Sequence, residues 1–286
     1  MKKITNFGNL PAENSRHSSS KIAIVPAPYD GTSTWIKGAD KGPEALISAS
    51  ANLELYDIET DSEVYQSGIF TDKFLRFGPT PEKMVLAVEK AVDRHIRNKK
   101  FTVLLGGEHS VSIGAIKAHA RNFKDLTVLQ LDAHGDTREK FEGSRFNHAC
   151  VMARAKEVCP IVQVGIRSFG AIEKKNMDAK RLFLAEKIIG RVDWMEKALA
   201  QLTSRVYITV DLDVFDPGIL PSTGTPEPGG MGWYAVLEFL KKVFDKKEVV
   251  GFDVVELCPN EKEKSSDFLA AKLVYKLLSY KFKSFK

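Results

Sequence analysis

The sequence predicts one α/β domain in which a parallel β-sheet is covered by helices on both faces. Apolar runs of strand length alternate with segments of helical periodicity, as expected of repeated βα units. These runs are apolar throughout, which is typical of strands that are buried on both faces. No linker and no internal repeat interrupts the 286 residues, a length that one large α/β domain can occupy.

Seven apolar segments are expected to form the strands of this sheet. Each of them is short and is bounded by Gly, Pro or polar residues. They are residues 21–26, 101–105, 126–131, 161–164, 182–184, 205–210 and 248–255. Residues 56–79 show no clear period, and no element is assigned to them.

Helices are expected between these strands. The clearest one begins after Thr80, because threonine is a good N-cap, Pro81 suits the first turn, and apolar residues recur over 84–96. Pro43 likewise suits the first turn of a helix that continues towards Leu53. The other expected helices cover about residues 110–121, 148–158, 169–177, 191–202, 232–245 and 266 onward.

The two ends of the chain differ in composition from the rest. Residues 1–20 are polar and Ser-rich, and we expect a poorly ordered N-terminal arm there, followed by a single domain over residues 21–286. The last residues, 280–286, are locally basic and are expected to be a solvated helix end. The N-terminus has no apolar signal segment, and no apolar run approaches the length of a membrane span, so a cytoplasmic location is expected.

Composition restricts the classes of partner that this protein is expected to bind. The net charge of +5 is modest and the basic residues are spread along the chain, so neither nucleic acid nor a membrane is an expected partner. Three cysteines, Cys150, Cys159 and Cys258, form no CxxC pair and have no zinc-site spacing. They suit a reducing cytosol.

Acidic and imidazole side chains follow three of the predicted strands at their carboxyl ends. In parallel α/β sheets that edge is where ligands bind. Carboxylates packed closely would raise one another's pKa, so a dense cluster indicates bound cations; the alternative is a loop whose Asp and His only cap the next helix. Oxygen ligands mixed with imidazole nitrogen suit manganese better than zinc or iron, and four Asp charges balance two divalent ions. The candidate ligands are His109, Asp132, His134, Asp136, Asp211 and Asp213.

Three motifs resemble the signatures of the ureohydrolase family, which includes arginase and agmatinase. They are GGEHS at 106–110, DAHGD at 132–136 and DLDVFDP at 211–217. Further segments that look like this family are 30–33, 41–46, 165–168, 223–230 and 253–256. The resemblance covers roughly residues 22–280, with the motifs in the family's order.

The resemblance implies a three-layer α/β/α fold with an eight-stranded parallel sheet and two manganese ions (Mn²⁺) per chain. It implies that the two ions are held by His109 with Asp136 and by His134 with Asp213, and bridged by Asp132 and Asp211. Since relatives form trimers and hexamers, it also implies a homo-oligomer.

The resemblance further implies roles for residues around the metals. His148 falls where the family has a proton-shuttling histidine, and Glu256 where it has a carboxylate that faces the guanidinium group. Thr225 is expected to line the same pocket. A hydroxide held by two metals could attack the guanidinium carbon, and a histidine near its unperturbed pKa could protonate the leaving amine.

The expected reaction is hydrolysis of a small guanidino compound, with agmatine, converted to putrescine and urea, as the leading substrate. The segment 137–146 has no obvious clamp for the α-carboxylate of arginine, whereas Glu139 and Glu142 could attract a distal amine. N1-aminopropylagmatine, guanidinobutyrate and arginine remain alternatives. Deacetylation with one zinc ion is disfavoured because ligands for a second metal are present, and a non-catalytic binding role is disfavoured because no ligand is missing.

Overall fold

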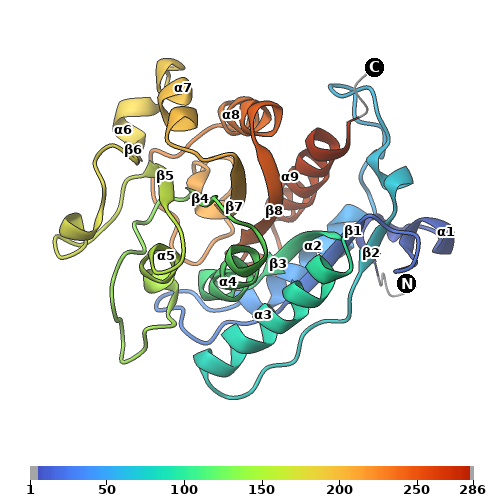
Figure 1. Cartoon of the computed structure of the whole chain (residues 1–286), viewed down its shortest axis with the longest axis horizontal. Coiled ribbons are helices and arrows are strands. Elements are labelled where there is room, and N and C mark those ends of the chain that lie inside the picture. The colour runs from blue at the N-terminus through green and yellow to red at the C-terminus, as the bar shows by residue number, and fades with distance from the viewer. Residues whose placement is uncertain (1–5, 284–286) are drawn as a thin grey trace.

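Eight parallel strands form one sheet in the computed structural model, which describes residues 6–283 (Figure 1). The strands are β1 (Ile22–Ala27), β2 (Ile69–Thr71), β3 (Phe101–Gly106), β4 (Leu126–Leu131), β5 (Ile161–Ile166), β6 (Leu182–Leu184), β7 (Arg205–Asp211) and β8 (Glu248–Val255). Their order across the sheet is β2-β1-β3-β8-β7-β4-β5-β6. The predicted fold class is therefore confirmed.

Helices cover both faces of the sheet (Figure 1). One apolar core packs α3 (Pro81–Arg97), α4 (Ser112–Asn122) and α5 (Val151–Lys156) against the sheet. The other core packs α2 (Gly42–Ser50), α7 (Asp193–Ala200), α8 (Trp233–Lys246) and α9 (Ser265–Phe282) against the opposite face. Side chains on a strand alternate between the two cores, as Ile24 and Val25 of β1 do.

Local sequence signals explain the best-defined elements. At the start of α3 the Thr80 side chain accepts a hydrogen bond from Lys83 N, and Pro81 occupies the first helical position, as predicted. Most strand residues are buried, which agrees with runs that are apolar throughout. Among residues 6–283, no helix combines the length and the apolar character that crossing a lipid bilayer requires.

From residue 21 onward, the structure differs from the predicted elements most clearly at the following places. β2 lies in the segment 56–79, to which no element was assigned. The helix predicted over 169–177 is wrong: only a single 3₁₀ turn, Lys174–Asn176, forms there. The short helix α6 (Ala185–Ile188), which follows β6, was not predicted.

The described part of the expected N-terminal arm packs against the domain. Phe7 is fully buried and Leu10 nearly so, and both belong to the core that contains α2 and α9. Two short helical turns, Phe7–Asn9 and α1 (Ala12–Ser15), form in this segment. Residues 1–5 of the expected arm and residues 284–286 of the basic tail lie outside the described residues.

The crossover order of the central strands places distant parts of the chain side by side. β8 lies between β3 and β7, and β7 pairs with β4 on its other side. All four strands run in parallel, so their carboxyl ends meet at one edge of the sheet. That edge carries the candidate functional residues.

Candidate metal centre and active site

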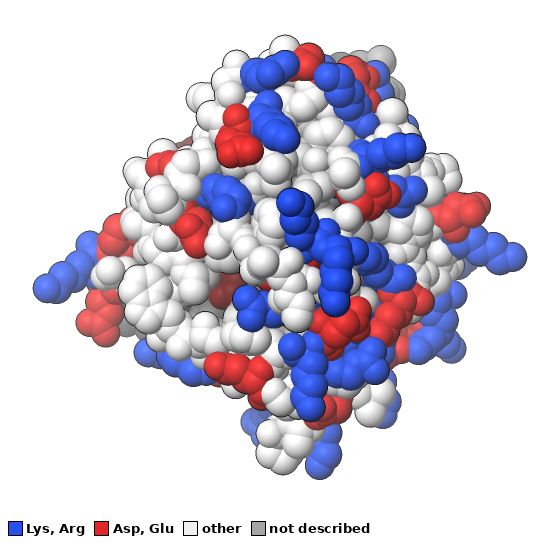
Figure 2. Space-filling model, turned by 90° about the vertical axis from the view of Figure 1, so that its left-hand side faces the viewer, with Lys and Arg blue, Asp and Glu red and all other residues white. Residues whose placement is uncertain are grey.

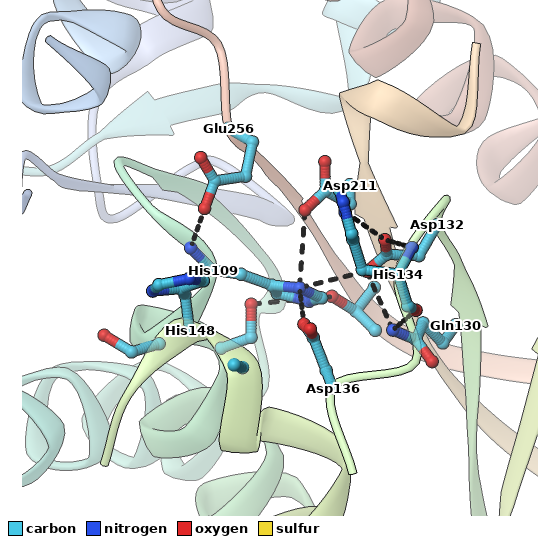
Figure 3. A network of polar contacts seen from close by, with 12 residues as sticks. His109, Gln130, Asp132, His134, Asp136, His148, Asp211 and Glu256 are labelled. Atoms are coloured by element: carbon cyan, nitrogen blue, oxygen red, sulfur yellow. Dashed lines mark hydrogen bonds and ion pairs between the residues drawn. The ribbon is translucent and has the colours of Figure 1, made fainter. Parts of the chain in front are cut away.

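The predicted metal ligands come together at the carboxyl ends of three central strands. His109 lies in the 3₁₀ turn after β3, and the group at Asp132, His134 and Asp136 follows β4. Asp211 ends β7, and Asp213 lies in the 3₁₀ turn that follows it. Figure 3 shows the contacts between these side chains converging on His109.

Three buried carboxylates surround one nitrogen of His109. Its Nδ1 atom lies 2.9 Å from Asp136 Oδ2, 3.2 Å from Asp132 Oδ2 and 3.4 Å from Asp211 Oδ2. The other nitrogen, Nε2, lies 2.9 Å from Thr209 Oγ1, and that hydroxyl donates to the buried carboxylate of Asp253. Since Thr209 gives its own proton to Asp253, it accepts one from His109 Nε2, and in the neutral imidazole the Nδ1 lone pair then points at the carboxylates.

A second group of ligand atoms adjoins the first. His134 Nδ1 lies 2.8 Å from Asp213 Oδ2 and 3.7 Å from Asp132 Oδ1. The ligand atoms of each group lie within 4.8 Å of one another, as those of a metal site do: His109 with Asp132 and Asp211, and Asp132 with His134 and Asp213. Asp132 belongs to both groups, so its carboxylate lies between them.

Neighbouring polar groups hold these carboxylates in place. Gln130 Nε2 donates a hydrogen bond to Asp132 Oδ2 at 2.7 Å. Gln163 Nε2 in turn donates to Gln130 Oε1 at 2.7 Å. Backbone N–H groups donate to Asp211 and Asp213 at 2.9 Å each. Ligands that are oriented before a metal arrives bind it with less reorganisation.

The charges at this cluster favour a cation. Burial and the nearby Asp132 carboxylate raise the pKa of Asp136 to about 7. Burial, Asp213 and Asp132 raise the pKa of Asp211 well above its usual range. Burial lowers the pKa of His109, but Asp132 and Asp136 outweigh it and raise that pKa well above its usual range. His109 Nδ1 is buried without a hydrogen-bond partner, so divalent ions fit this set of donors.

Two of the site residues have strained backbone conformations. Asp136 has a φ of 52° and Glu256 a φ of 65°, in the left-handed region that residues with a side chain rarely adopt. Glu256 directly follows β8, and its Oε1 accepts a hydrogen bond from His109 N at 2.6 Å. Strain of this kind is found where a site requires one particular orientation.

A cavity of about 410 Å³ opens above the metal ligands. Its walls include His148, Thr225 and Glu256, the three residues predicted to act beside the metals. Figure 3 shows His148 and Glu256 beside His109. Burial and the nearby charges of His134 and His109 lower the pKa of His148 to about 4, so His148 is neutral at pH 7.

Glu139 and Glu142 do not belong to the described lining of this cavity. The Glu139 side chain is 70% exposed, and its Oε2 accepts a hydrogen bond from Arg154 at 2.7 Å. Glu142 is exposed at the tip of a turn that Phe141 and Ser144 close by mutual backbone hydrogen bonds of 2.9 Å. Neither carboxylate therefore lines the cavity in which the substrate's tail was expected to contact it.

Instead, residues that the sequence analysis did not single out form the mouth of the cavity. Arg138, Phe141, Phe169 and Glu173 line it. Arg138 lies over the Phe141 ring, 4.4 Å from its centroid, and its Nε is 3.3 Å from Glu173 Oε2. The only sequence signal was the position of Arg138 and Phe141 between two site residues, Asp136 and His148.

Comparisons with known proteins agree with this fold and site. A family model described as the arginase family matches residues 20–279. An N(1)-aminopropylagmatine ureohydrolase from Synechocystis sp. is 39% identical over 275 residues, covering 92% of this chain and 90% of the relative. An agmatinase from Pyrococcus horikoshii is 32% identical, covering 88% of this chain and 89% of the relative. The solved structure of an agmatine ureohydrolase from Thermoplasma volcanium superposes with a TM-score of 0.86 at 29% identity, covering 99% of this chain and 95% of that one.

The fold and the paired His/Asp clusters define a hydrolase of the metal-dependent type. The chain belongs to the arginase family, and its relatives from Synechocystis and Pyrococcus are ureohydrolases.

Proposed function

We propose that this protein hydrolyses the guanidino group of agmatine to give putrescine and urea, a step of polyamine biosynthesis. The observation that carries the proposal is the single cavity in which two ligand clusters adjoin an acidic and an imidazole side chain, Glu256 and His148. Water adds its oxygen to the guanidinium carbon and the carbon–nitrogen bond to the tail breaks. The nitrogen keeps the bonding electron pair and gains a proton.

Glu256 is suited to hold the guanidinium group. Its Oε1 accepts from His109 N, which leaves the second lone pair of that oxygen and both lone pairs of Oε2 for a cationic ligand. Burial and the carboxylate of Glu108 raise the pKa of Glu256 well above its usual range, so a cation placed beside it relieves an unfavourable charge. Paired hydrogen bonds from a planar guanidinium to a carboxylate fix the plane of the group that reacts.

His148 is suited to move the proton. It lines the same cavity and is neutral at pH 7, so it can take the proton that the attacking water releases. The protonated imidazole then donates to the leaving amine, which departs readily only as a protonated group.

Two manganese ions fit the ligand set better than zinc or iron. Four carboxylates and two imidazoles form the cluster, a set rich in the oxygen ligands that manganese accepts. His109 with Asp136 would hold one ion and His134 with Asp213 the other, and Asp132 and Asp211 would contribute to holding both. Bound ions would supply water activation, because they lower the pKa of water towards neutrality.

The mouth of the cavity supports a substrate without a carboxylate on its tail. Among the described lining residues, Arg138 is the cation at the mouth, and it is paired with Glu173 and stacked on Phe141. An α-carboxylate would therefore meet no unpaired positive charge there. An aliphatic tail can pack against Phe141 and Phe169.

N1-aminopropylagmatine is the second candidate substrate. The Synechocystis relative at 39% identity carries that name, and so does one from Thermus thermophilus at 36%. The longer amine tail of this compound would extend past Arg138 into solvent, where the exposed Glu139 and Glu142 could attract it. Guanidinobutyrate and arginine each place a carboxylate at the mouth and are weaker candidates.

The proposal also includes the compartment, the partners and the assembly state of the protein. We infer a cytoplasmic enzyme that acts on a small molecule and assembles as a homo-oligomer, as a trimer or hexamer. The three cysteines are unpaired, which suits a reducing compartment. Basic and acidic side chains are interspersed on the face shown in Figure 2, without the continuous basic stripe of a nucleic-acid-binding surface.

Urea release from four substrates tests the proposal. Manganese-loaded enzyme should hydrolyse agmatine or N1-aminopropylagmatine with a kcat/KM at least about a hundredfold above that for arginine and guanidinobutyrate, because a buried unpaired carboxylate is costly. Enzyme treated with a chelator serves as the control and should release no urea. Fastest release from arginine would overturn the substrate assignment, and no release from any of the four would overturn the proposed function.

A further inference from the structure

A hydroxyl group beside His148 has no role in the proposed function. It belongs to Thr32, within the family-like segment 30–33. Thr32 is buried and lies in the loop after β1, 116 positions before His148 in the sequence. A hydrogen bond to one ring nitrogen of a histidine determines which nitrogen carries the proton.

The loop that carries Thr32 is fixed against the loop after β3. Glu108 N donates to Tyr29 O at 2.8 Å. This close approach requires glycine at position 107, since a Cβ atom on Gly107 would lie 2.0 Å from that same oxygen. Further along the first loop, the Asp30 carboxylate accepts two backbone hydrogen bonds at 2.6 and 3.2 Å. Thr32 is therefore held in place by both loops.

The Thr32 hydroxyl makes two contacts with His148. Oγ1 accepts a hydrogen bond from His148 N at 3.0 Å and lies 3.2 Å from His148 Nδ1. The two contacts join the loop after β1 to the start of the turn that carries His148, and together they fix where the imidazole lies.

The hydroxyl contacts one nitrogen of the His148 ring and leaves the other free. A threonine hydroxyl can donate to a ring nitrogen or accept from it. In either case the contact with Nδ1, together with the contact to the backbone N–H, fixes how the ring lies against Thr32. Nε2, the opposite ring nitrogen, is left for other partners.

We propose that Thr32 is a positioning residue, whose hydroxyl contacts the backbone N–H and Nδ1 of His148 and orients the imidazole, so that Nε2 exchanges a proton with the reacting groups. The inference rests on the proposed function, because it requires His148 to carry a proton. Nε2 takes a proton released by the attacking water and gives it to the leaving nitrogen. The imidazole is therefore neutral before and after each turnover.

The test compares two substitutions at position 32 in the manganese-loaded enzyme. Thr32→Val keeps the shape of the side chain but removes the hydroxyl, and it should lower kcat about tenfold or more, with KM within about twofold and metal content unchanged. Thr32→Ser restores the hydroxyl and should recover most of the lost kcat. Should the valine variant fail to fold, Thr32→Ala removes the hydroxyl without adding bulk.

A double variant separates positioning from general structural support. His148→Ala alone should lower kcat about a hundredfold or more, and adding Thr32→Val to it should lower kcat no further, since the hydroxyl acts only through the imidazole. The matched control is Thr102→Val, which removes a threonine hydroxyl 2.9 Å from His119, another buried histidine, and should leave kcat unchanged.

The outcomes distinguish this inference from the function on which it rests. Full kcat in Thr32→Val, or losses that add in the double variant, would overturn the role of Thr32 while His148→Ala still supports the proton carrier. Full kcat in His148→Ala would overturn the role of His148 itself, and that of Thr32 with it.

Discussion

At the scale of single residues, His119 illustrates how burial couples stability to pH. Its Nδ1 lies 2.8 Å from Ala115 O, its Nε2 lies 2.9 Å from Thr102 Oγ1, and its ring centroid lies 4.4 Å from that of Tyr207. Burial lowers the pKa of His119 from 6.5 to about 4. Protonation of His119 is therefore much less favourable in the folded protein than in the unfolded chain.

We predict that this histidine destabilises the protein in mild acid. Between pH 6.5 and pH 4 the unfolded chain binds the extra proton and the folded protein does not, so the free energy of unfolding falls as the pH falls. The contribution of neutral His119 to the free energy of unfolding is fully present above pH 6.5. About 3 kcal/mol of that free energy is lost by pH 4. Urea unfolding of metal-free protein at several pH values measures it, with His119→Gln as the comparison. If both proteins lose stability equally on acidification, His119 does not account for the effect.

At the scale of elements, Glu173 connects the loop after β4 with the loop after β5. Its buried carboxylate accepts hydrogen bonds from Thr137 N at 3.1 Å and Gly170 N at 2.8 Å, and pairs with Arg138 at 3.3 Å. The first of these loops carries Asp136. One carboxylate thus fixes both the mouth of the cavity and the segment that presents a metal ligand.

We predict that Glu173→Ala lowers stability by about 1 to 3 kcal/mol, the usual cost of leaving buried donors without an acceptor. It should also raise KM for agmatine, because Arg138 loses its partner and its charge repels a cationic tail. Urea unfolding and steady-state kinetics measure the two effects. The control is Glu186→Gln, at an exposed position of α6, which should change neither. An unchanged KM in Glu173→Ala would contradict the role given to Arg138 at the mouth.

The sequence predicted the buried elements well because their signal is local. Runs such as 126–131 and 205–210 are apolar throughout, and the structure has strands at both. β2 was missed because its three residues, Ile69–Thr71, lie within the segment 56–79, which shows no clear period. The helix over 169–177 was wrong because the Glu173 side chain accepts the N–H of Gly170 and so holds a turn there.

Some residues of the candidate site could likewise be predicted from the sequence, and others could not. Ligands such as Asp132 and His134 could be predicted because they directly follow a recognisable strand and alternate along it. The mouth could not be predicted, because whether Glu139 or Phe141 faces the cavity depends on the path of an irregular loop. The contact between Thr32 and His148 depends on two loops far apart in sequence, which no local pattern reveals.

At the scale of the whole molecule, we predict that metal binding stabilises the fold. Manganese should bind at about two equivalents per chain and raise Tm. Each occupied site adds about 2.7 kcal/mol to the free energy of unfolding when free metal is a hundred times the Kd of that site. Asp132→Ala should lose both ions because Asp132 belongs to both ligand groups. Elemental analysis and thermal unfolding measure these effects, with Asp193→Ala, an exposed change on α7, as the control. Saturation at one equivalent would contradict the two-metal assignment.

The position of β8 between β3 and β7 has a consequence for the protein during its synthesis on the ribosome. His109 lies at the end of β3, whereas its partners Asp132 and Asp211 lie at the ends of β4 and β7, on the far side of β8. Until residue 255 has left the exit tunnel, the native sheet has a gap between these two groups. A nascent chain can present each half of the metal centre but not the whole, so the complete centre forms only after β8 has been synthesised.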